Sequence, residues 1–278
     1  INRITGTGTD EFGYGTGDLA TVDTSTTVQA SQWTALLGKL NIARSHQDTS
    51  INISTFSVSS GDIIAAIANV ATDIGTVTTN KANVKADGIT ANAYTTKTFT
   101  GSWKVNTIYE FKLAFAGGDE ARFFFNAGGT ITTGVTLSGH TSDTKADNWA
   151  SLLTAAGTYQ VTAQASGKSG GSGSADTNNT NLGYYDMGTS YTIGFKQFED
   201  TSPYTASFVQ WEWKTASSGA EVHAKCTWND AAADNTGFNK SIYNVQDQVD
   251  GTQRMVFAYE KHNTTHIADN GGSITQTS

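Results

Sequence analysis

The pair His262 and His266 is the first pattern in this chain whose residue types and spacing could do chemistry. Two histidines four residues apart lie on one face of a helix, where both imidazoles can bind a metal ion. The residues between them, Asn263-Thr264-Thr265, favour a turn or a strand instead. The other histidines stand apart from this pair in sequence: His46, His140 and His223. Because the sequence has no Asp-rich calcium loop either, we expect no metal ion and no cofactor.

Two glycine-rich stretches match the sequence motifs of functional loops but lack the flanking secondary structure that these motifs require. Gly13-Tyr14-Gly15-Thr16-Gly17 lacks the spacing and the strand-turn-helix surroundings of a phosphate-binding loop. Residues 1–28 are therefore interpreted as an extended arm that lies on a neighbouring subunit. Gly167-Lys168-Ser169-Gly170-Gly171 matches a hydrolase nucleophile elbow, but low-complexity sequence flanks it on both sides. Residues 166–181 are predicted to form a mobile loop.

No other group of residues in the sequence has the types and spacing of a catalytic site. Cys226 lies in an alternating apolar stretch and is predicted to be a buried small hydrophobe rather than a nucleophile. A glycosidase needs two carboxylates that the fold brings together, which the sequence alone neither supplies nor excludes. Trp103, Tyr184 and Tyr185 could stack on sugars if they are exposed, or fill a β core if they are not. We therefore expect a protein that is not an enzyme.

The composition argues against several classes of protein. Charged residues make up 15% of the 278 residues and Gly numbers 29, a balance that fits short strands joined by polar turns. The formal net charge of −8, without any cluster of Lys and Arg, argues against a nucleic-acid partner. No apolar run reaches the length of a membrane span, so no membrane insertion is expected. A single cysteine cannot form a disulfide framework within the chain.

The chain is organised around the stretch Ala121–Gly129, in which an apolar run ends in an Asn-Ala-Gly-Gly turn. Large apolar residues occupy every second position from Tyr109 to Phe115, which is typical of a half-buried strand. Gly117-Gly118-Asp119 supplies turn residues, so the sequence predicts a hairpin whose second strand is Ala121–Phe125, followed by a third strand from Thr130. Three consecutive phenylalanines would face both sides of the second strand, which predicts that it is covered above and below. The predicted core motif comprises Arg122, Phe123, Phe124, Phe125, Asn126, Gly128 and Gly129.

Two helices are predicted near the N-terminal end. Residues 31–46 carry one apolar stripe, with Ser31 as the nearest capping candidate and with Arg44 and His46 as cations at the C-terminal end. A second helix is predicted from Ser60 or Gly61 to about residue 77. It has a seam of β-branched residues at heptad spacing: Ile63, Ile67, Val70, Ile74 and Val77. Such a seam favours three or more helices, so it predicts an oligomer interface, preferably of a trimer. The alternative is that the helix packs on its own domain.

From about residue 93 onwards the sequence predicts strands. The alternation in Val209–Trp213 and Val222–Trp228 predicts inward-facing stripes of antiparallel sheets. One or two helical turns are predicted at Asp147–Leu153, and 229–239 is predicted to be a polar loop. The fold class is therefore mainly β: an antiparallel β-sandwich (jelly-roll-like) body with two short N-terminal helices and an extended N-terminal arm. Residues 1–92 are predicted to form the arm and a helical attachment and oligomerisation region, and residues 93–278 the sandwich domain.

Three groups of residues, taken in order, resemble a known family. The first group is Phe12-Gly13-Tyr14-Gly15, Ser31-Gln32-Trp33, Leu40-Asn41 and Ala43-Arg44-Ser45-His46-Gln47. The second is Ala121–Ile131 with Asn148-Trp149 and Leu152-Leu153, and the third is Gly183-Tyr184-Tyr185-Asp186-Met187. Their order resembles virion structural proteins of tailed bacteriophages, of the fibre or appendage type found in cyanophage-like myoviruses. The resemblance extends over residues 12–187 and more loosely beyond.

This resemblance implies a structural component of a phage virion that is not an enzyme, in a fibre or appendage of the tail, baseplate or neck, at the exterior of the particle. Its expected partners are copies of itself, preferably as a trimer, and other virion proteins. One alternative is a carbohydrate- or receptor-binding β-sandwich module at a fibre tip, with a host surface glycan as its partner. Another is a polysaccharide depolymerase, although the sequence shows neither solenoid repeats nor a paired-acid motif.

Overall fold

The computed structural model describes residues 1–25, 27–50, 67–142, 144–231, 248–262, 264–267 and 273–277. The chain forms two compact units. Unit 1 comprises residues 1–91, 115–129 and 260–273, and unit 2 comprises residues 92–114, 130–259 and 274–278. The predicted boundary at residues 92 and 93 falls where the chain first passes from unit 1 to unit 2. Two later segments of the chain also join unit 1, which a division of the sequence into two consecutive parts does not include.

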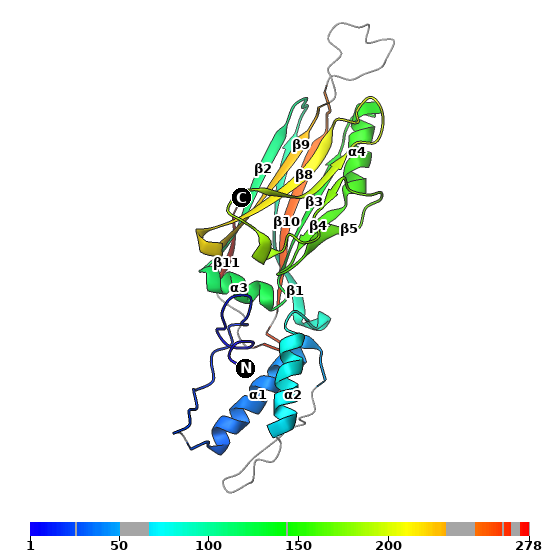
Figure 1. Ribbon diagram of the computed structural model, residues 1–278. Coiled ribbons are helices and arrows are strands. Elements are labelled where there is room, and N and C mark those ends of the chain that lie inside the picture. Colours follow the sequence, from blue (N-terminus) through cyan, green and yellow to red (C-terminus); the bar gives the residue numbers. More distant parts are fainter. Residues whose placement is uncertain are drawn as a thin grey trace, which may run out of the picture. The chain divides into compact units, whose positions relative to one another are not determined.

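Unit 2 is built mainly from two sheets, which confirms the predicted mainly β, antiparallel sandwich (Figure 1). The first sheet has the strand order β1-β10-β3-β4-β5, with β1 at Ile89–Thr100, β10 at Thr252–His262, β3 at Thr130–Ser138, β4 at Thr158–Val161 and β5 at Ser166–Ser169. The second has the order β11-β2-β9-β8-β7-β6, with β11 at Ile274–Thr277, β2 at Thr107–Phe115, β9 at Glu221–Asn229, β8 at Phe208–Ala216, β7 at Thr192–Phe198 and β6 at Thr177–Asn178.

Aromatic side chains from both sheets fill the space between them. Alternate residues of β8 and β9 are buried, as the period-two pattern predicted, and Trp213 and Cys226 are both completely covered. Phe111 of the second sheet stacks on Phe257 of the first at a ring-centroid distance of 5.4 Å. Tyr159 of β4 lies 6.1 Å from Trp213. Because large aromatic side chains bury the most apolar area per residue, they dominate the stability of this core.

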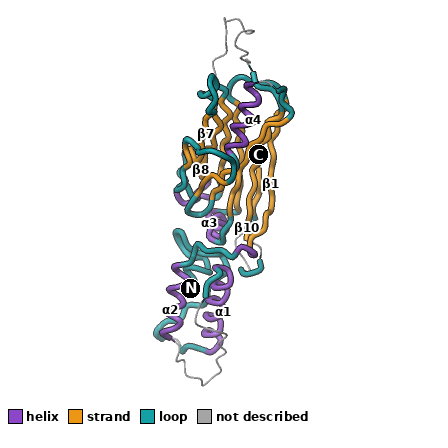
Figure 2. The backbone as a smooth tube through the Cα atoms, turned by 90° about the vertical axis from the view of Figure 1, so that its right-hand side faces the viewer, coloured by secondary structure: helices purple, strands orange, loops and turns teal. Residues whose placement is uncertain are grey.

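A helix, α4 (Thr144–Ala156), packs on the sandwich beside β3 and β8 (Figures 1 and 2). The sequence predicted only Asp147–Leu153 as helical, and the helix begins and ends three residues further out on each side. Its Trp149 lies between two other tryptophans, at 4.6 Å from Trp103 and 5.9 Å from Trp228. All three side chains are buried. Trp103 is therefore a core residue, which is the second of the two alternatives that the sequence left open.

The predicted mobile loop at residues 166–181 contains two short strands. β5 pairs antiparallel with β4, and β6 pairs antiparallel with β7. Backbone pairing at a sheet edge needs no apolar side chains, so the polar composition gave no signal of it. Glycine has a steric role here: Gly171 has φ of +70°, and a Cβ atom there would clash with the carbonyl of Ala155.

In unit 1 the helices α1 (Ala30–Gln47) and α2 (Ile67–Thr79) lie side by side (Figures 1 and 2). A shared apolar cluster joins them to other segments of the unit: Ile4, Tyr14, Leu37, Leu40, Ala43, Val70, Val77, Ala127 and Ile267. The N-cap of α1 is Gln29 rather than the predicted Ser31, and its backbone amide donates to the side-chain oxygen of Gln32 at 2.9 Å. Asp48 ends the helix in the left-handed conformation, with φ of 49°.

The predicted strand at Ala121–Phe125, the second strand of the expected hairpin, is wrong, because the core motif forms a helix, α3 (Gly118–Asn126). The third strand that was predicted to follow it is confirmed as β3. Asp119 and Glu120 stand in its first turn, where the helix dipole favours negative charge. Arg122 forms an i, i+3 ion pair with Asp119 at 2.8 Å. Gly128, with φ of +90°, follows the helix in a conformation that other residues rarely adopt. All three phenylalanines are buried, since the whole circumference of this short helix is covered.

Three single turns of 3-10 helix complete the described elements. They are η1 (Ala86–Gly88), η2 (Tyr184–Asp186) and η3 (Ser217–Gly219). The hydroxyl of Tyr184 donates to the carbonyl of Gly219 at 2.9 Å, which ties η2 to η3 within unit 2. Tyr184 is buried and Tyr185 is half-buried, so of the two alternatives for this pair the core role applies to Tyr184 and only part of the Tyr185 ring is exposed.

Candidate binding pockets

Residues that carry the phage resemblance come together in unit 1. The guanidinium of Arg122 donates to the carbonyl of Phe12 at 2.7 Å, and the amide of Asn126 donates to the carbonyl of Gly13 at 3.0 Å. A Cβ atom on Gly15 would clash with the ring of Phe123. The segment around residues 12–15, which was predicted to be an arm on a neighbouring subunit, therefore packs on its own chain. We call these contacts between residues 12–15 and α3 the α3 clasp.

Tyr14 extends the α3 clasp to both long helices. Its hydroxyl donates to the carbonyl of Lys81 at 2.7 Å and accepts from the amide of Gln47 at 2.7 Å. Gln47 also donates to the carbonyl of Val77 at 3.0 Å. Burial raises the pKa of Tyr14, and the hydrogen bond from Gln47 opposes that shift. Buried polar groups of this kind are retained where their hydrogen bonds fix the packing of neighbouring elements.

The histidine pair of the sequence lies beside a third histidine. The ring of His262 is 6.3 Å from that of His266 and 4.5 Å from that of His46, which in turn contacts Tyr14. His46 is fully buried, so its predicted role as a cation at the end of α1 is wrong. Burial is the main cause that lowers the pKa of His46 to about 3, and the two neighbouring histidines add to the shift. Burial and His266 lower the pKa of His262 to about 4. Both rings are therefore neutral near pH 7.

His266 contacts the side chain of Asp87 at 3.1 Å. Within the described part of the chain, no group of three or more His, Cys, Asp or Glu side chains is placed to hold a metal ion. The three histidines approach through ring faces and edges rather than by converging on one point. His46 and His262 are thus packed, neutral side chains of unit 1, and their protonation would cost stability.

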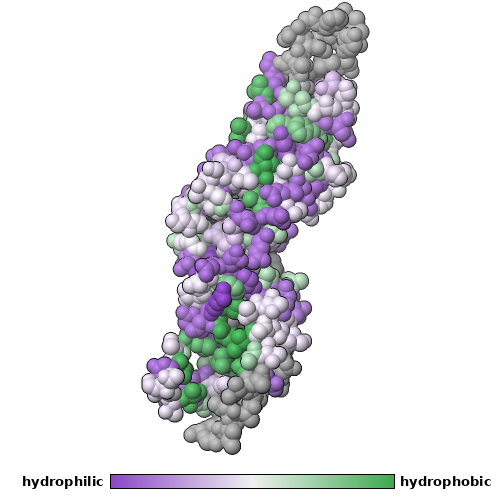
Figure 3. All heavy atoms as spheres, viewed as in Figure 1, coloured by the Kyte–Doolittle hydropathy of each residue, from purple (hydrophilic) through white to green (hydrophobic). Residues whose placement is uncertain are grey.

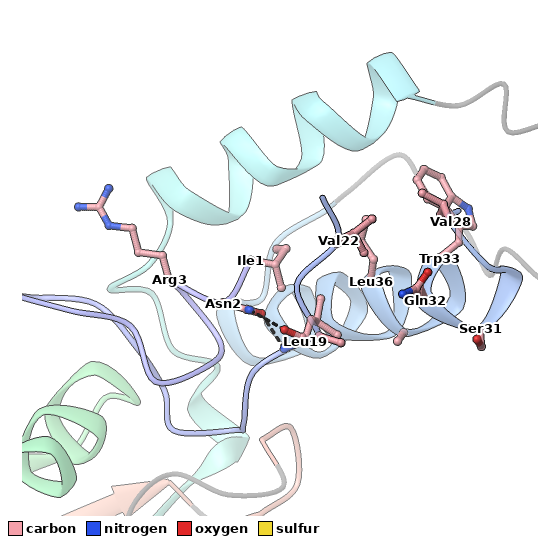
Figure 4. Close-up of a pocket in the computed structure, with 12 residues that line it drawn as sticks. Ile1, Asn2, Arg3, Leu19, Val22, Val28, Ser31, Gln32, Trp33 and Leu36 are labelled. Atoms are coloured by element: carbon pink, nitrogen blue, oxygen red, sulfur yellow. Dashed lines mark hydrogen bonds between the residues drawn. The ribbon is translucent and has the colours of Figure 1, made fainter. Parts of the chain in front are cut away.

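The N-terminal segment and α1 line an open apolar pocket with a volume of about 630 Å³. Its apolar lining residues are Ile1, Leu19, Ala20, Val22, Val28, Trp33, Ala35 and Leu36. Figure 4 shows Val22 close to Leu36 of α1, with Ile1 and Leu19 at the same side of the helix, whereas the charged end of Arg3 points away. Asn2 fixes the strand-like segment at the pocket wall through hydrogen bonds with the backbone of Leu19 at 2.9 and 2.8 Å.

Hydrophobic surface gathers on unit 1 in the face that Figure 3 shows. Val22 and Val28 at the pocket are 41% and 50% exposed. Since isolated surface valines are ordinary but a hollow lined by several apolar side chains is a recognised feature of binding sites, we treat this pocket as a candidate binding site.

A second pocket, in unit 2, is polar and has a volume of about 730 Å³. It is lined by α4, by the turn after β5 and by the end of β7, and it carries three acids: Asp176, Glu199 and Asp200. Asp176 accepts from the backbone amide of Phe198 at 2.7 Å. Burial raises the pKa of Glu199, and hydrogen bonds from Thr201 oppose that shift. Acids, hydroxyls and one aromatic ring are the groups that hold polyhydroxylated ligands.

The members of the predicted oligomer seam have different environments. Val70 and Val77 are buried in the shared cluster of unit 1, and Ile74 packs against that cluster while part of its side chain stays exposed. Ile63 lies outside the described residues, and Ile67 begins α2. Asp73, which the periodicity did not single out, lies on the same face of α2 and is fully buried. For Val70 and Val77 the structure shows packing within the chain, the alternative that the sequence left open.

Comparisons with models of known protein families, with curated proteins and with solved structures found no match to this chain. Of the helices that the structure describes, none has both the length and the apolar character that a membrane span requires.

Proposed function

We propose that this chain is a structural component of a tailed-bacteriophage virion, in a fibre or appendage of the tail, baseplate or neck. The α3 clasp is the observation that carries the proposal. Residues of the first and second groups of the resemblance are far apart in sequence, yet Phe12 and Gly13 accept hydrogen bonds from Arg122 and Asn126. Residues that support one packed unit are expected to occur together in related proteins, so this contact supports the resemblance on which the proposal is based.

The apolar pocket supplies an attachment site for such a component. Protein interfaces are organised around apolar side chains that fill a partner's pocket, and rim charges contribute less. We propose that unit 1 receives an apolar side chain or segment of another virion protein in the pocket beside α1. Unit 2, with its aromatic core, is then the body that the attachment holds on the particle.

The presence of the chain in purified particles tests the proposal. Particles of the phage that encodes the chain should contain it at a fixed ratio to the major structural proteins, as measured by quantitative mass spectrometry after density purification. Antibodies against the chain should label particles at one site in electron micrographs. Particles of full infectivity that lack the chain would overturn the proposal.

Substitutions in the pocket test the attachment site separately. Val22→Asp together with Val28→Asp should leave the circular dichroism spectrum of the chain unchanged, because both side chains are already substantially exposed, and should reduce its incorporation into particles at least tenfold. Val105→Asp is the matched control, because Val105 is 66% exposed and belongs to unit 2. Equal incorporation of the pocket variant and the control would remove the pocket from the proposal while leaving the virion role standing.

Self-association through α2 remains part of the proposal, with a trimer preferred. Ile74 is the described member of the seam that retains exposed surface, so Ile74→Asp should dissociate an assembly that uses this helix. Light scattering of the purified chain at several concentrations measures the mass directly. A concentration-independent monomer would mean that the seam serves only internal packing.

The polar pocket favours a second candidate, a carbohydrate-binding module at a fibre tip. Asp176 and Asp200 are exposed acids at the pocket, and Phe198 offers a ring for stacking. Asp176→Asn with Asp200→Asn should then abolish binding on an array of bacterial surface glycans. Asp186→Asn is the control, because this exposed acid does not line the pocket. Glycan binding that the pocket variant retains would exclude this site.

A further inference from the structure

A lysine and an aspartate are buried against each other in unit 2. Nζ of Lys145 lies 2.6 Å from Oδ2 of Asp230, and the two side chains are 1% and 0% exposed. Lysine is almost never fully buried, because taking its charge out of water costs several kcal/mol unless strong contacts compensate it. The predicted polar loop at 229–239 gave no sign that Asp230 is a core residue.

Two regular elements bring these side chains together in register. Lys145 and Trp149 stand four residues apart on one face of α4, and Trp228 lies in the last residues of β9, with Asp230 directly after the strand. The rings of Trp149 and Trp228 are stacked, with an interplanar angle of 8°. Lys145 and Asp230 meet beside this stacked pair, so the same packing of α4 on the sheet fixes their contact.

The contact has the distance of an ion pair but not the angles of a hydrogen bond. An ammonium group has three N–H donors, whereas an amide nitrogen has one. The region is poor in acceptors: among the described residues, the indole N–H groups of Trp103 and Trp149 have no hydrogen-bond partner. An amide nitrogen therefore needs fewer acceptors here than an ammonium group does.

We propose that Lys145 and Asp230 are joined by an intramolecular isopeptide bond that forms when the chain folds. Transfer of one proton from the ammonium to the carboxylate gives the neutral amine, which is the nucleophile, and the neutral acid, whose hydroxyl can leave as water. Nζ then attacks Cγ of Asp230, Oδ2 leaves with two protons as water, and Oδ1 becomes the amide oxygen. The reaction condenses one amine and one acid into one amide and one water, and it needs no oxidant or co-reactant.

Ser207 is placed to assist the addition step. Its hydroxyl donates to Oδ1 of Asp230 at 3.3 Å, where negative charge develops when the amine adds to the carboxyl carbon. The backbone of Ser207 is itself fixed, because its carbonyl accepts from the amide of Glu199 at 2.9 Å. The fold supplies the remaining requirement by holding nucleophile and electrophile in contact, which replaces a bimolecular reaction by an intramolecular one.

The bond would close a loop of about 85 residues and fasten the beginning of α4 to the end of β9. Covalent closure of a long loop limits the unfolded ensemble, as a disulfide does, but it is not reversed by reducing agents. A chain with one cysteine thereby obtains a cross-link that cysteine pairing could not provide.

The intact mass of the full chain, measured after denaturation, tests this proposal. The wild-type chain should be lighter than its sequence by one water molecule, and proteolysis should release one linked peptide that contains both Lys145 and Asp230. Lys145→Arg keeps the positive charge but should have the full mass of its sequence. Asp230→Asn should instead lose ammonia and reach the same final mass as the wild-type chain.

Two outcomes would overturn the proposal. A wild-type chain of full sequence mass would show that Lys145 and Asp230 form only an ion pair. Loss of water that persists in Lys145→Arg would place the dehydration elsewhere, for example at Asp87-Gly88 or Asp250-Gly251, where a succinimide can form. The wild-type mass alone decides the first point, so the test does not depend on the variants folding.

Discussion

The two units of this chain solve the problem of burial with different residues. Unit 2 fills its sandwich with aromatic rings, and four tryptophans are among its most completely buried side chains: Trp149, Trp211, Trp213 and Trp228. Unit 1 packs α1 and α2 through smaller aliphatic residues and also buries His46, Gln47 and Asp73. The difference teaches that unit 2 is stabilised mainly by its aromatic area, whereas unit 1 depends in addition on the neutral state of buried histidines.

The largest effect is expected from removing one ring of the tryptophan cluster. Trp228→Ala should lower the free energy of unfolding by about 3–5 kcal/mol, because it removes a buried ring and leaves a cavity between Trp103 and Trp149. Urea titration measures the change. Ile108→Ala on the same sheet is the control, because Ile108 is 54% exposed, and its effect should stay below about 0.5 kcal/mol. Equal effects would contradict the assignment of Trp228 to the core.

Substitution of one glycine tests the packing of unit 1 without changing any of its polar side chains. Gly128 has φ of +90° and a Cβ atom there would clash with Val84, so Gly128→Ala should cost about 2–4 kcal/mol. Gly139 has φ of +63° with no atom near a Cβ position, so Gly139→Ala should cost only about 1 kcal/mol. Thermal unfolding of both variants separates the cost of the steric clash from the cost of the backbone conformation. A cost that is the same at the two positions would mean that the turn after α3 is not tightly packed.

Acid should destabilise unit 1 through its buried histidines. The pKa of His46 is about 3 in the folded chain, below the ordinary value of 6.5. Because the unfolded chain binds the extra proton first, the stabilising contribution is complete above about pH 6.5 and is lost as the pH falls towards 3. His46 alone should lower the free energy of unfolding by about 2 kcal/mol between pH 7 and pH 4.5.

Urea titrations at several pH values, with His46→Phe as the matched variant, measure this contribution. The neutral ring of Phe cannot take up a proton, so the slope of stability against pH should become smaller in that variant. His262, His266, Tyr14 and Asp87 are the titratable groups of the same cluster, and they remain in both proteins. An unchanged slope would exclude His46 as the source of the acid sensitivity.

The smallest effect concerns the beginning of α1. Gln32→Ala removes the acceptor of the Gln29 backbone amide and should cost about 0.5–1 kcal/mol. Ser31→Ala should cost less, since Gln29 rather than Ser31 is the N-cap. A larger loss for Ser31→Ala, measured by thermal unfolding, would contradict the observed capping.

The sequence predicted those features that arise from local periodicity. The alternation along β2, β8 and β9, the burial of Cys226 and the apolar stripe of α1 were all visible, because one buried face imposes a fixed repeat. The stretch Ala121–Phe125 was assigned to a strand because three consecutive phenylalanines hide the helical repeat. The acids at 119 and 120 and the ion pair from Asp119 to Arg122 were the available signal for α3.

The contacts that form the candidate sites could not be predicted from local sequence patterns. Lys145 and Asp230 meet across α4 and β9, and His46 meets His262 across most of the chain, so neither pair leaves a repeat in the sequence. The apolar pocket is formed by a segment without regular structure, and the polar pocket by a turn whose composition suggested disorder. Such sites depend on tertiary packing, which overrides local composition.

Hydrogen–deuterium exchange at pH 7 and pH 4.5, corrected for the intrinsic rate at each pH, tests the contrast between the two units most directly. We predict that amides of α1 lose protection at pH 4.5, because protonation of His46 and His262 favours opening of unit 1. Amides of β8 and β9 should keep their protection, because their core is filled by the rings of Trp211, Trp213 and Trp228 rather than by histidines. Equal loss of protection in both units, or loss in the sandwich alone, would contradict the account.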